Sequence, residues 1–150
     1  MTIREAKVDD LPELAQLMDA YRVFYAQPSD SKASGAFLAD RIELRDSRIF
    51  IALLGEKAVG FTQLYPSFSS VGLIRIYILN DLYVNPDYRG QGIGEALLKK
   101  AQEFCISEGA RGLALETAVE NPAQYLYERL GWIKDESFFH YFWTSPTHNP

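Results

Sequence analysis

The chain has 150 residues, of which 47% are hydrophobic and 23% charged, and its net charge is −5. A chain of this length is expected to form one domain, residues 1–150, that buries roughly 70% of the unfolded surface. The 13% aromatic content excludes a collagen-like or disordered chain. The acidic balance disfavours a nucleic-acid partner, because phosphates are bound by clustered Lys and Arg.

The sequence also argues against a membrane protein and against a metal site. Its longest apolar run, residues 49–54, is far shorter than the ~20 residues that span a bilayer, and its first residues do not resemble a signal peptide. We therefore expect a cytoplasmic protein without a membrane partner. The single Cys105 cannot form an internal disulfide, and no CxxC or HExxH spacing occurs, so no metal is predicted.

Hydrophobic periodicity predicts the elements of the first half of the chain, in order: a strand at 3–6, a helix at 11–25, a helix at 37–44, and a hairpin of strands at 49–54 and 58–65. Asp9 or Asp10 is expected to cap the first helix. The polar segment 27–35 reads as a connecting loop, and Pro66 is expected to end the second strand of the hairpin.

The second half is predicted to contain, in order, a strand at 73–84, a helix that includes 93–105, a strand at 112–119, a helix that begins at 122, and an aromatic strand at 138–144. We expect the strand at 73–84 to be the longest. Gly109 and Gly131 are natural helix ends, and Asn121 is the expected N-cap before Pro122 at the first helical position.

This order of elements defines the expected fold class. It is a single-domain mixed α/β fold with a mostly antiparallel sheet, flanked by helices. The strand, helix and strand over 73–119 should form a central parallel, right-handed βαβ unit. We expect the chemistry at the ends of its strands.

A glycine-rich segment, RGQGIGE at residues 89–95, lies where the strand at 73–84 gives way to a helix. Backbone N–H groups at a helix start bind phosphate, and glycines let the ligand approach them. The dinucleotide fingerprint fails here because Glu95 stands where it needs Gly, and the P-loop fails because no Lys follows. The pattern R-x-x-G-x-G fits Arg89, Gly92 and Gly94. A tight turn with a solvated Arg is the structural alternative.

Two motifs carry a resemblance to a known family. The segment LNDLYVNPDYRGQGIGEALL (79–98) resembles the acetyl-CoA-binding motif of the GNAT superfamily of N-acetyltransferases, and NPAQYLYERLGW (121–132) is similar to its second signature. The element order also matches that superfamily, which implies a GNAT-like acyl-CoA N-acyltransferase fold. The segment GFTQLYPSFSS (60–70), followed by ILNDLYV, is most similar to the diamine and small-amine acetyltransferase branch.

The resemblance implies acetyl-CoA as co-substrate. It assigns the following residues to the cofactor: Leu82, Tyr83 and Val84 through their backbones on the pantetheine arm, Arg89, Gly90, Gln91, Gly92, Ile93, Gly94 and Glu95 around the diphosphate, and Asn121 from the next helix. For Asn121, a simple N-cap remains the alternative, and both roles are compatible.

Direct attack by an amine on the thioester needs proton transfers. An amine of pKa ~10.4 is reactive in only about one molecule in 10³ at pH 7, so a proton acceptor is useful. A Tyr can protonate the departing thiolate, and Tyr127 occupies the Tyr position of the second signature. Tyr127 also falls on the apolar face of its helix with Leu126 and Leu130, so a packing role remains open.

The base is less well defined, because Asn80 stands where the diamine-acetylating relatives carry Glu, and Asn cannot accept a proton. Asp81 falls on the opposite face of the strand by alternation, which also suits a structural role at the strand end. Glu116 is a candidate base acting through water, with an ordinary salt bridge as the alternative. Tyr25 and Tyr65 are expected to line the acceptor pocket, where aromatic faces favour a cation.

Together these features predict an enzyme that transfers acetyl from acetyl-CoA to a primary amine, such as a polyamine, a diamine or a lysine-like side chain. The substrate-binding candidates are Tyr25, Tyr65, Asn80 and Asp81. A protein or peptide N-acetyltransferase and a non-catalytic acyl-CoA-binding module of the same fold are the alternatives. Relatives of this branch are commonly dimeric, so a homodimer is expected.

Overall fold

The computed structural model describes residues 1–148 of the chain. The chain divides into two compact units, which meet in sequence between Glu116 and Thr117. The first unit contains the sheet and helices α1 to α3, and the second contains helix α4 (Ala123–Arg129). That the whole chain forms one domain stays a prediction.

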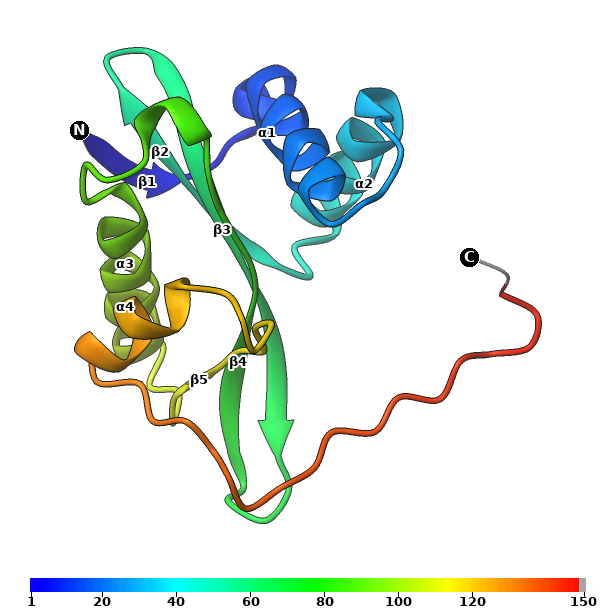
Figure 1. The fold of residues 1–150 in the computed structure, drawn as a ribbon, viewed down its shortest axis with the longest axis vertical. Coiled ribbons are helices and arrows are strands. Elements are labelled where there is room, and N and C mark those ends of the chain that lie inside the picture. The colour runs from blue at the N-terminus through cyan, green and yellow to red at the C-terminus, as the bar shows by residue number, and fades with distance from the viewer. Residues whose placement is uncertain (149–150) are drawn as a thin grey trace. The chain divides into compact units, whose positions relative to one another are not determined.

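The first unit is built on one mixed five-stranded sheet (Figure 1). Its strands are β1 (Thr2–Glu5), β2 (Arg48–Leu54), β3 (Lys57–Ser69), β4 (Ile74–Val84) and β5 (Leu113–Ala114), and they are hydrogen-bonded in this order. The first three pairings are antiparallel and the last is parallel. Helix α3 (Ile93–Ser107) connects β4 to β5. The predicted mixed, mostly antiparallel sheet with a parallel βαβ unit is confirmed.

Helices cover both faces of this sheet. Helices α1 (Leu11–Phe24) and α2 (Ser31–Leu44) lie on one side and α3 on the other (Figure 1). Strand β2 explains the two layers, because Ile49 and Ile51 join the core beneath α1 and α2, whereas the Phe50 ring lies 5.5 Å from the Phe104 ring of α3. A strand buried on both faces reads as an unbroken apolar run, as residues 49–54 do.

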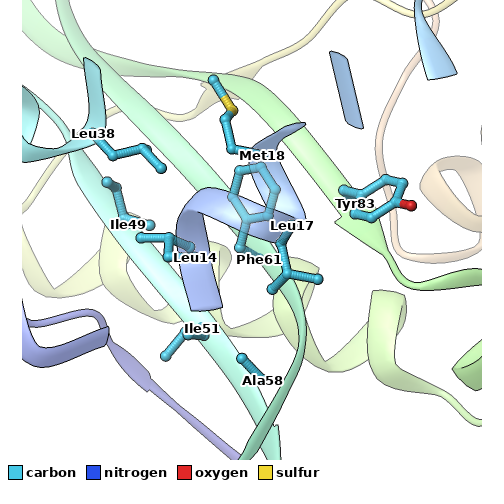
Figure 2. Packing of buried hydrophobic residues seen from close by; sticks show 9 residues of the cluster. All are labelled: Leu14, Leu17, Met18, Leu38, Ile49, Ile51, Ala58, Phe61 and Tyr83. Carbon is cyan, nitrogen blue, oxygen red and sulfur yellow. The ribbon is translucent and has the colours of Figure 1, made fainter. Parts of the chain in front are cut away.

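The core beneath α1 joins residues from both helices and three strands (Figure 2). Its buried members are Leu14, Leu17, Met18, Leu38, Ile49, Ile51, Ala58, Phe61 and Tyr83. Those on α1 recur at the helical spacing from which that helix was predicted. Burying each large side chain contributes roughly 1.5–3 kcal/mol, so this cluster determines how α1 sits on the sheet.

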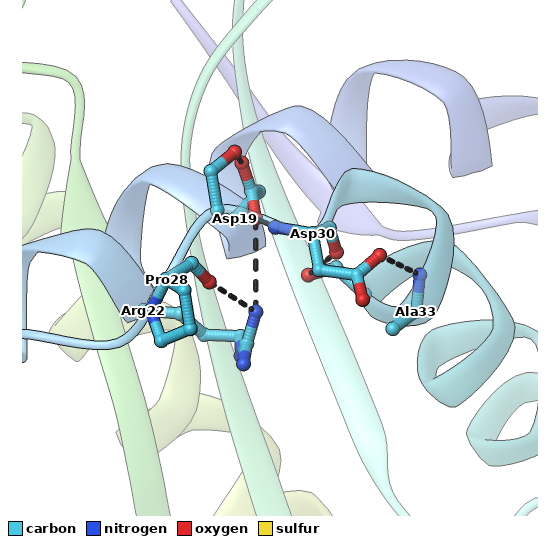
Figure 3. A network of polar contacts seen from close by, with 7 residues as sticks. Asp19, Arg22, Pro28, Asp30 and Ala33 are labelled. Atoms are coloured by element: carbon cyan, nitrogen blue, oxygen red, sulfur yellow. Dashed lines mark hydrogen bonds and ion pairs between the residues drawn. The ribbon is translucent and has the colours of Figure 1, made fainter.

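Helix α2 begins at Ser31, within the segment expected to be a loop, so the predicted start near residue 37 is wrong. The reason is a cap, because the Asp30 carboxylate accepts a hydrogen bond from the Ala33 N–H at 3.0 Å (Figure 3). The Asp19 carboxylate of α1 in turn accepts the Asp30 N–H at 2.6 Å, and Arg22 donates to the Pro28 carbonyl at 3.3 Å. These contacts tie the short connection to α1.

Strand β3 runs through Pro66, which was expected to end it. Pairing with β2 stops at Leu64, so beyond that residue one side of β3 is an edge without a ladder partner. Proline is tolerated at such an edge because no hydrogen bond requires its missing N–H. With 13 residues β3 is longer than the 11-residue β4, which corrects the expectation that the strand at 73–84 is the longest.

Two predicted strands near the C-terminus are also corrected. Strand β5 covers only Leu113–Ala114 rather than 112–119, because its pairing with β4 extends over two residues. Among the described residues of the second unit no strand occurs, so the aromatic segment 138–144 is not a strand there. Aromatic residues favour a strand only where a neighbouring strand offers packing.

Helix α4 begins at Ala123, one residue later than predicted. The Asn121 side chain still serves its start, because Oδ1 accepts the Ala123 N–H at 3.0 Å. The expected helix end at Gly131 agrees with its φ of +87°. None of the helices in residues 1–148 is long and apolar enough to cross a membrane.

Candidate active site

The glycine-rich loop forms the start of α3. A short 3-10 turn, Pro86–Tyr88, leads into it, and Gly90 and Gly92 adopt φ values of +74° and +77°. The first hydrogen bond of the helix runs from the Ala96 N–H to the Gly92 carbonyl at 3.0 Å. Backbone amides that precede Ala96 therefore lie outside the helical ladder, at the positive end of the helix dipole.

The space beside this loop is open. A Cβ atom placed on Gly90 or Gly92 would meet no atom within 4 Å, so neither glycine is there to make room for protein. The backbone conformation requires glycine at both positions, because an L-residue with a positive φ destabilises the fold by roughly 1–2 kcal/mol. The loop thus presents turned amides to a volume that an anionic ligand can enter.

Arg89 is held beside the loop by its side chain. Its Nε donates to the Val84 carbonyl at 2.9 Å, and its guanidinium carbon lies 5.8 Å from the centre of the Phe24 ring and 5.6 Å from that of Tyr83. Cation–π contacts of this kind orient a guanidinium. Arg89 is therefore more than the solvated residue of a tight turn.

The end of β4 presents an open backbone edge. The Asn85 N–H donates to a β3 carbonyl at 2.9 Å. Antiparallel pairs alternate, so Tyr83 also turns its N–H and C=O toward β3, whereas Leu82 and Val84 turn theirs to the opposite edge. Among the described residues, β5 pairs with this opposite edge only at 77–78. The Arg89 Nε already donates to the Val84 carbonyl at this edge, so the Leu82 N–H and C=O and the Val84 N–H are left for another extended molecule.

A bulge separates this open edge from the rest of β4. Gln63 pairs with Asp81 and Leu64 with Leu79, which leaves Asn80 as the extra residue. Asn80 is exposed and Asp81 is only 4% exposed, in keeping with opposite faces. The bulge nevertheless brings the two neighbouring side chains together, because the Asn80 Nδ2 donates to the Asp81 Oδ1 at 3.1 Å.

The Asp81 carboxylate is buried among neutral groups. Burial raises its pKa above the usual range, and hydrogen bonds from Gln63, Asn80 and Tyr21 oppose that shift. The Gln63 Nε2 donates to Asp81 Oδ2 at 2.9 Å, and the Ser47 hydroxyl donates to Gln63 Oε1 at 2.9 Å. Among residues 1–148, no cationic side chain contributes to this shift.

Aromatic rings gather around the bulge. The Tyr21 ring lies 5.0 Å from the Tyr25 ring and 6.0 Å from the Tyr83 ring. The Tyr21 hydroxyl donates to the main-chain carbonyl oxygen of Asn80 at 3.5 Å. Tyr65 is half-buried, and burial together with the Asp81 charge raises its pKa to about 12. Burial and the Asp81 charge also raise the pKa of Tyr21, so the Tyr21 and Tyr65 hydroxyls both stay protonated at neutral pH.

The first unit thus brings together Tyr25, Tyr65, Asn80, Asp81, Arg89 and the glycine loop, which are connected through contacts with Tyr21, Tyr83 and Asp81. Glu116 is exposed and lies beyond β5 at the end of that unit. Asn121 and Tyr127 belong to the second unit, where the Tyr127 ring lies 6.0 Å from the Trp132 ring. A metal-binding group of three or more His, Cys, Asp or Glu side chains is absent from residues 1–148.

Ser47 and Gln63 were missed by the sequence analysis. Gln63 interrupts the apolar segment at 58–65, and a polar amide inside a buried strand needs a partner, which is the signal that could have singled it out. No comparable signal existed for Ser47, which lies in a turn-rich polar segment.

Comparison with known proteins identifies the family of the chain. The model of the acetyltransferase (GNAT) family matches residues 13–132. A Bacillus subtilis protein named uncharacterized N-acetyltransferase YhfO is 46% identical over 142 residues, which cover 94% of this chain and 95% of that protein. A thialysine N-epsilon-acetyltransferase of Bos taurus is 41% identical over 78 residues, which cover 51% of this chain and 45% of that protein.

A solved structure gives the same result. The crystal structure of a probable acetyltransferase superposes with a TM-score of 0.91 at 38% identity, covering 97% of this chain and 98% of that one. The family uses acetyl-CoA as its co-substrate, and the open edge of β4 and the amides at the start of α3 suit that molecule. The chain therefore belongs to the GNAT family of acetyltransferases and is an acetyl-CoA-dependent N-acyltransferase.

Proposed function

We propose that this enzyme transfers the acetyl group of acetyl-CoA to a small primary amine of the polyamine, diamine or lysine-like class. The observation that carries this choice is the surroundings of the β4 bulge, where the exposed Asn80 contacts the buried Asp81 carboxylate and the Tyr21 hydroxyl, and the Tyr21 ring contacts the Tyr25 ring. Aromatic faces and a nearby negative charge favour a cationic amine. The partial similarity to a thialysine acetyltransferase supports the same class.

The cofactor is proposed to lie along the end of β4 and over the start of α3. The outward Leu82 C=O and Val84 N–H suit the amides of the pantetheine arm, which then extends the sheet as a strand does. Amides of the loop from Gly90 to Glu95, with Arg89 beside them, suit the diphosphate. Asn121 is proposed to add a contact from the second unit, beyond capping its own helix.

The reaction is a direct displacement. The amine nitrogen attacks the thioester carbon, a tetrahedral oxyanion forms, and the carbon–sulfur bond then breaks to release the CoA thiolate. The Leu82 N–H is the preferred oxyanion donor, because that of Tyr83 faces β3. An amine that binds as a cation loses one proton before it attacks and a second one afterwards, and the thiolate takes up one proton, so the reaction releases one proton overall.

Two residues are proposed to handle these protons. Tyr127 donates to the thiolate, because it occupies the Tyr position of the second family motif. Glu116 accepts the proton of the amine through water, since Asn80 cannot take a proton. The homodimer and the cytoplasmic location expected from the sequence stay predictions, and sedimentation of the purified protein tests the first.

The test is a panel of acceptors with acetyl-CoA, followed by release of the free thiol. Putrescine, spermidine, thialysine and lysine represent the proposed class, a peptide with a free N-terminus represents protein acetylation, and an amino-free alcohol serves as control. We expect the highest kcat/KM with a member of the first group. The rate should rise with pH below the amine pKa, because the reactive free amine grows about tenfold per pH unit. Preference for the peptide or the alcohol would overturn the proposed class.

A further inference from the structure

The bulge of β4 contains a carboxylate with an unusual environment. Asp81 is 4% exposed, yet all the hydrogen bonds that stabilise its charge come from the neutral side chains of Gln63, Asn80 and Tyr21. A buried charge without a cation destabilises a fold. The cost of a charge at this position points to a function that a neutral residue does not supply.

The carboxylate determines which way each neighbouring amide points. An ionised carboxylate only accepts hydrogen bonds, so both Gln63 and Asn80 must turn their NH₂ groups toward Asp81. The Ser47 hydroxyl, which donates to the Gln63 oxygen at 2.9 Å, holds Gln63 in that orientation. The same polarity leaves the oxygen of the exposed Asn80 amide directed away from Asp81.

We propose that Asp81 is a positioning residue, which holds the Asn80 side chain with its carbonyl oxygen outward so that this oxygen accepts a hydrogen bond from the acceptor amine. The proposal rests on the proposed amine acetylation. Asn80 then binds the amine without competing for its proton. The charge of the neighbouring Asp81 is buried behind the Asn80 side chain. The surface thus attracts a cation through a buried charge and contacts it through a neutral oxygen.

The first test observes the orientation itself, without any turnover. The side-chain amide of Asn80 gives a pair of ¹⁵N-resolved proton signals, which Asn80→Ala identifies by their loss. We expect one of these protons to be shifted downfield and protected from exchange by its bond to Asp81. Acidification should abolish this signature above the usual pKa of an Asp, because protonated Asp81 no longer requires two donors.

Other titrating groups near Asp81 must be told apart from it. Tyr21 of α1 and Tyr65 of β3 interact with its charge, and Arg41 of α2 and Asp46 act on Tyr65. Both Tyr hydroxyls have raised pKa values and stay neutral throughout the acidic range. Asp46 pairs with Arg41 at 2.7 Å, so Asp46→Asn identifies any contribution from that pair.

The second test is a double-mutant cycle on KM. We expect Asp81→Asn to raise KM for the amine about tenfold, the worth of one well-placed hydrogen bond, with the affinity for acetyl-CoA unchanged. In an Asn80→Ala background the same substitution should raise KM less than about threefold, because only the attraction between the Asp81 charge and the cation then remains. Asp10→Asn, which removes a carboxylate paired with Arg4 far along the chain, is the matched control and should leave KM unchanged.

The outcomes separate the two proposals. An equal rise in KM in both backgrounds would show that Asp81 acts independently of Asn80, and a parallel loss of acetyl-CoA affinity would show that it acts on the fold. Either result would overturn the positioning role. The wild-type protein alone can also overturn the positioning role. It would do so if turnover were normal and the Asn80 amide signal did not change as Asp81 is protonated. Absence of acetyl transfer to every amine would instead overturn the proposed function, and the acceptor role of Asn80 with it.

Discussion

Glycine at position 92 combines a backbone requirement with a proposed ligand contact, and a matched glycine separates the two. Gly92 and Gly109 have φ values of +77° and +63°, and a Cβ on either would meet no atom within 4 Å. Alanine at each should therefore lower the free energy of unfolding by about 1–2 kcal/mol, measured by urea denaturation. Only Gly92→Ala should also raise the Kd of acetyl-CoA, by about tenfold in calorimetric titration, because only Gly92 lies in the loop proposed to bind the diphosphate. Equal affinity of the two variants would place the diphosphate elsewhere.

Tyr127 is proposed to donate a proton to the leaving thiolate, an interaction that exists only as the thioester breaks. Tyr127→Phe should thus lower kcat by roughly 10²-fold and leave the Kd of acetyl-CoA nearly unchanged. Tyr125→Phe is the control, since this residue is 68% exposed on the same helix and should keep full activity. A Tyr127→Phe protein with normal kcat and a lowered Tm would instead assign the residue to packing, in keeping with its contact to Trp132.

The start of helix α2 depends on its capping residue, Asp30. The sequence predicted a loop at this position because it gave no sign of this cap. Asp30→Ala removes the acceptor of the Ala33 N–H and should lower the free energy of unfolding by about 1 kcal/mol. For a chain of this size, the Tm should fall by roughly 2–4 °C in a calorimetric scan. Asp40→Ala, an exposed position within the same helix, should cause no loss. Equal stability of the two variants would show that α2 is held by its core contacts alone.

The elements divide into those that periodicity predicts and those that pairing decides. Helices α1 and α3 follow from apolar residues at helical spacing, because a helix makes its hydrogen bonds within its own segment. The lengths of β3 and β5 were wrong because a strand extends as far as its partner does. Pro66 is tolerated where β2 no longer pairs, and β5 stops after two residues beside β4.

Binding of acetyl-CoA should stabilise the molecule as a whole, since the ligand binds the folded state and not the unfolded chain. At 100 times its Kd, acetyl-CoA should add about 2.7 kcal/mol to the free energy of unfolding. This corresponds to a Tm higher by roughly 5–10 °C, measured by differential scanning calorimetry. The Gly92→Ala variant should need a higher ligand concentration for the same shift. No change in Tm at millimolar acetyl-CoA would contradict the cofactor assignment.

The sequence by itself determined the family, the order of most elements and the position of the glycine-rich loop that is proposed to bind the cofactor. These follow from contiguous segments, because the motif at 79–98 contains both the end of a strand and the glycines whose backbone conformations the loop needs. The sequence also shows that Asn80 stands where the diamine-acetylating relatives carry Glu, and an amide cannot serve as a base.

Only the tertiary structure decided what surrounds Asn80. Strict alternation places Asp81 on the other face of the strand, but the bulge opposite Gln63 brings the Asn80 and Asp81 side chains into hydrogen-bonding distance. Gln63 lies 18 positions from Asp81 in the chain, and Ser47 lies 16 from Gln63. Hydrogen bonds between residues so far apart depend on strand register, which the pairing of whole strands determines and no local pattern encodes.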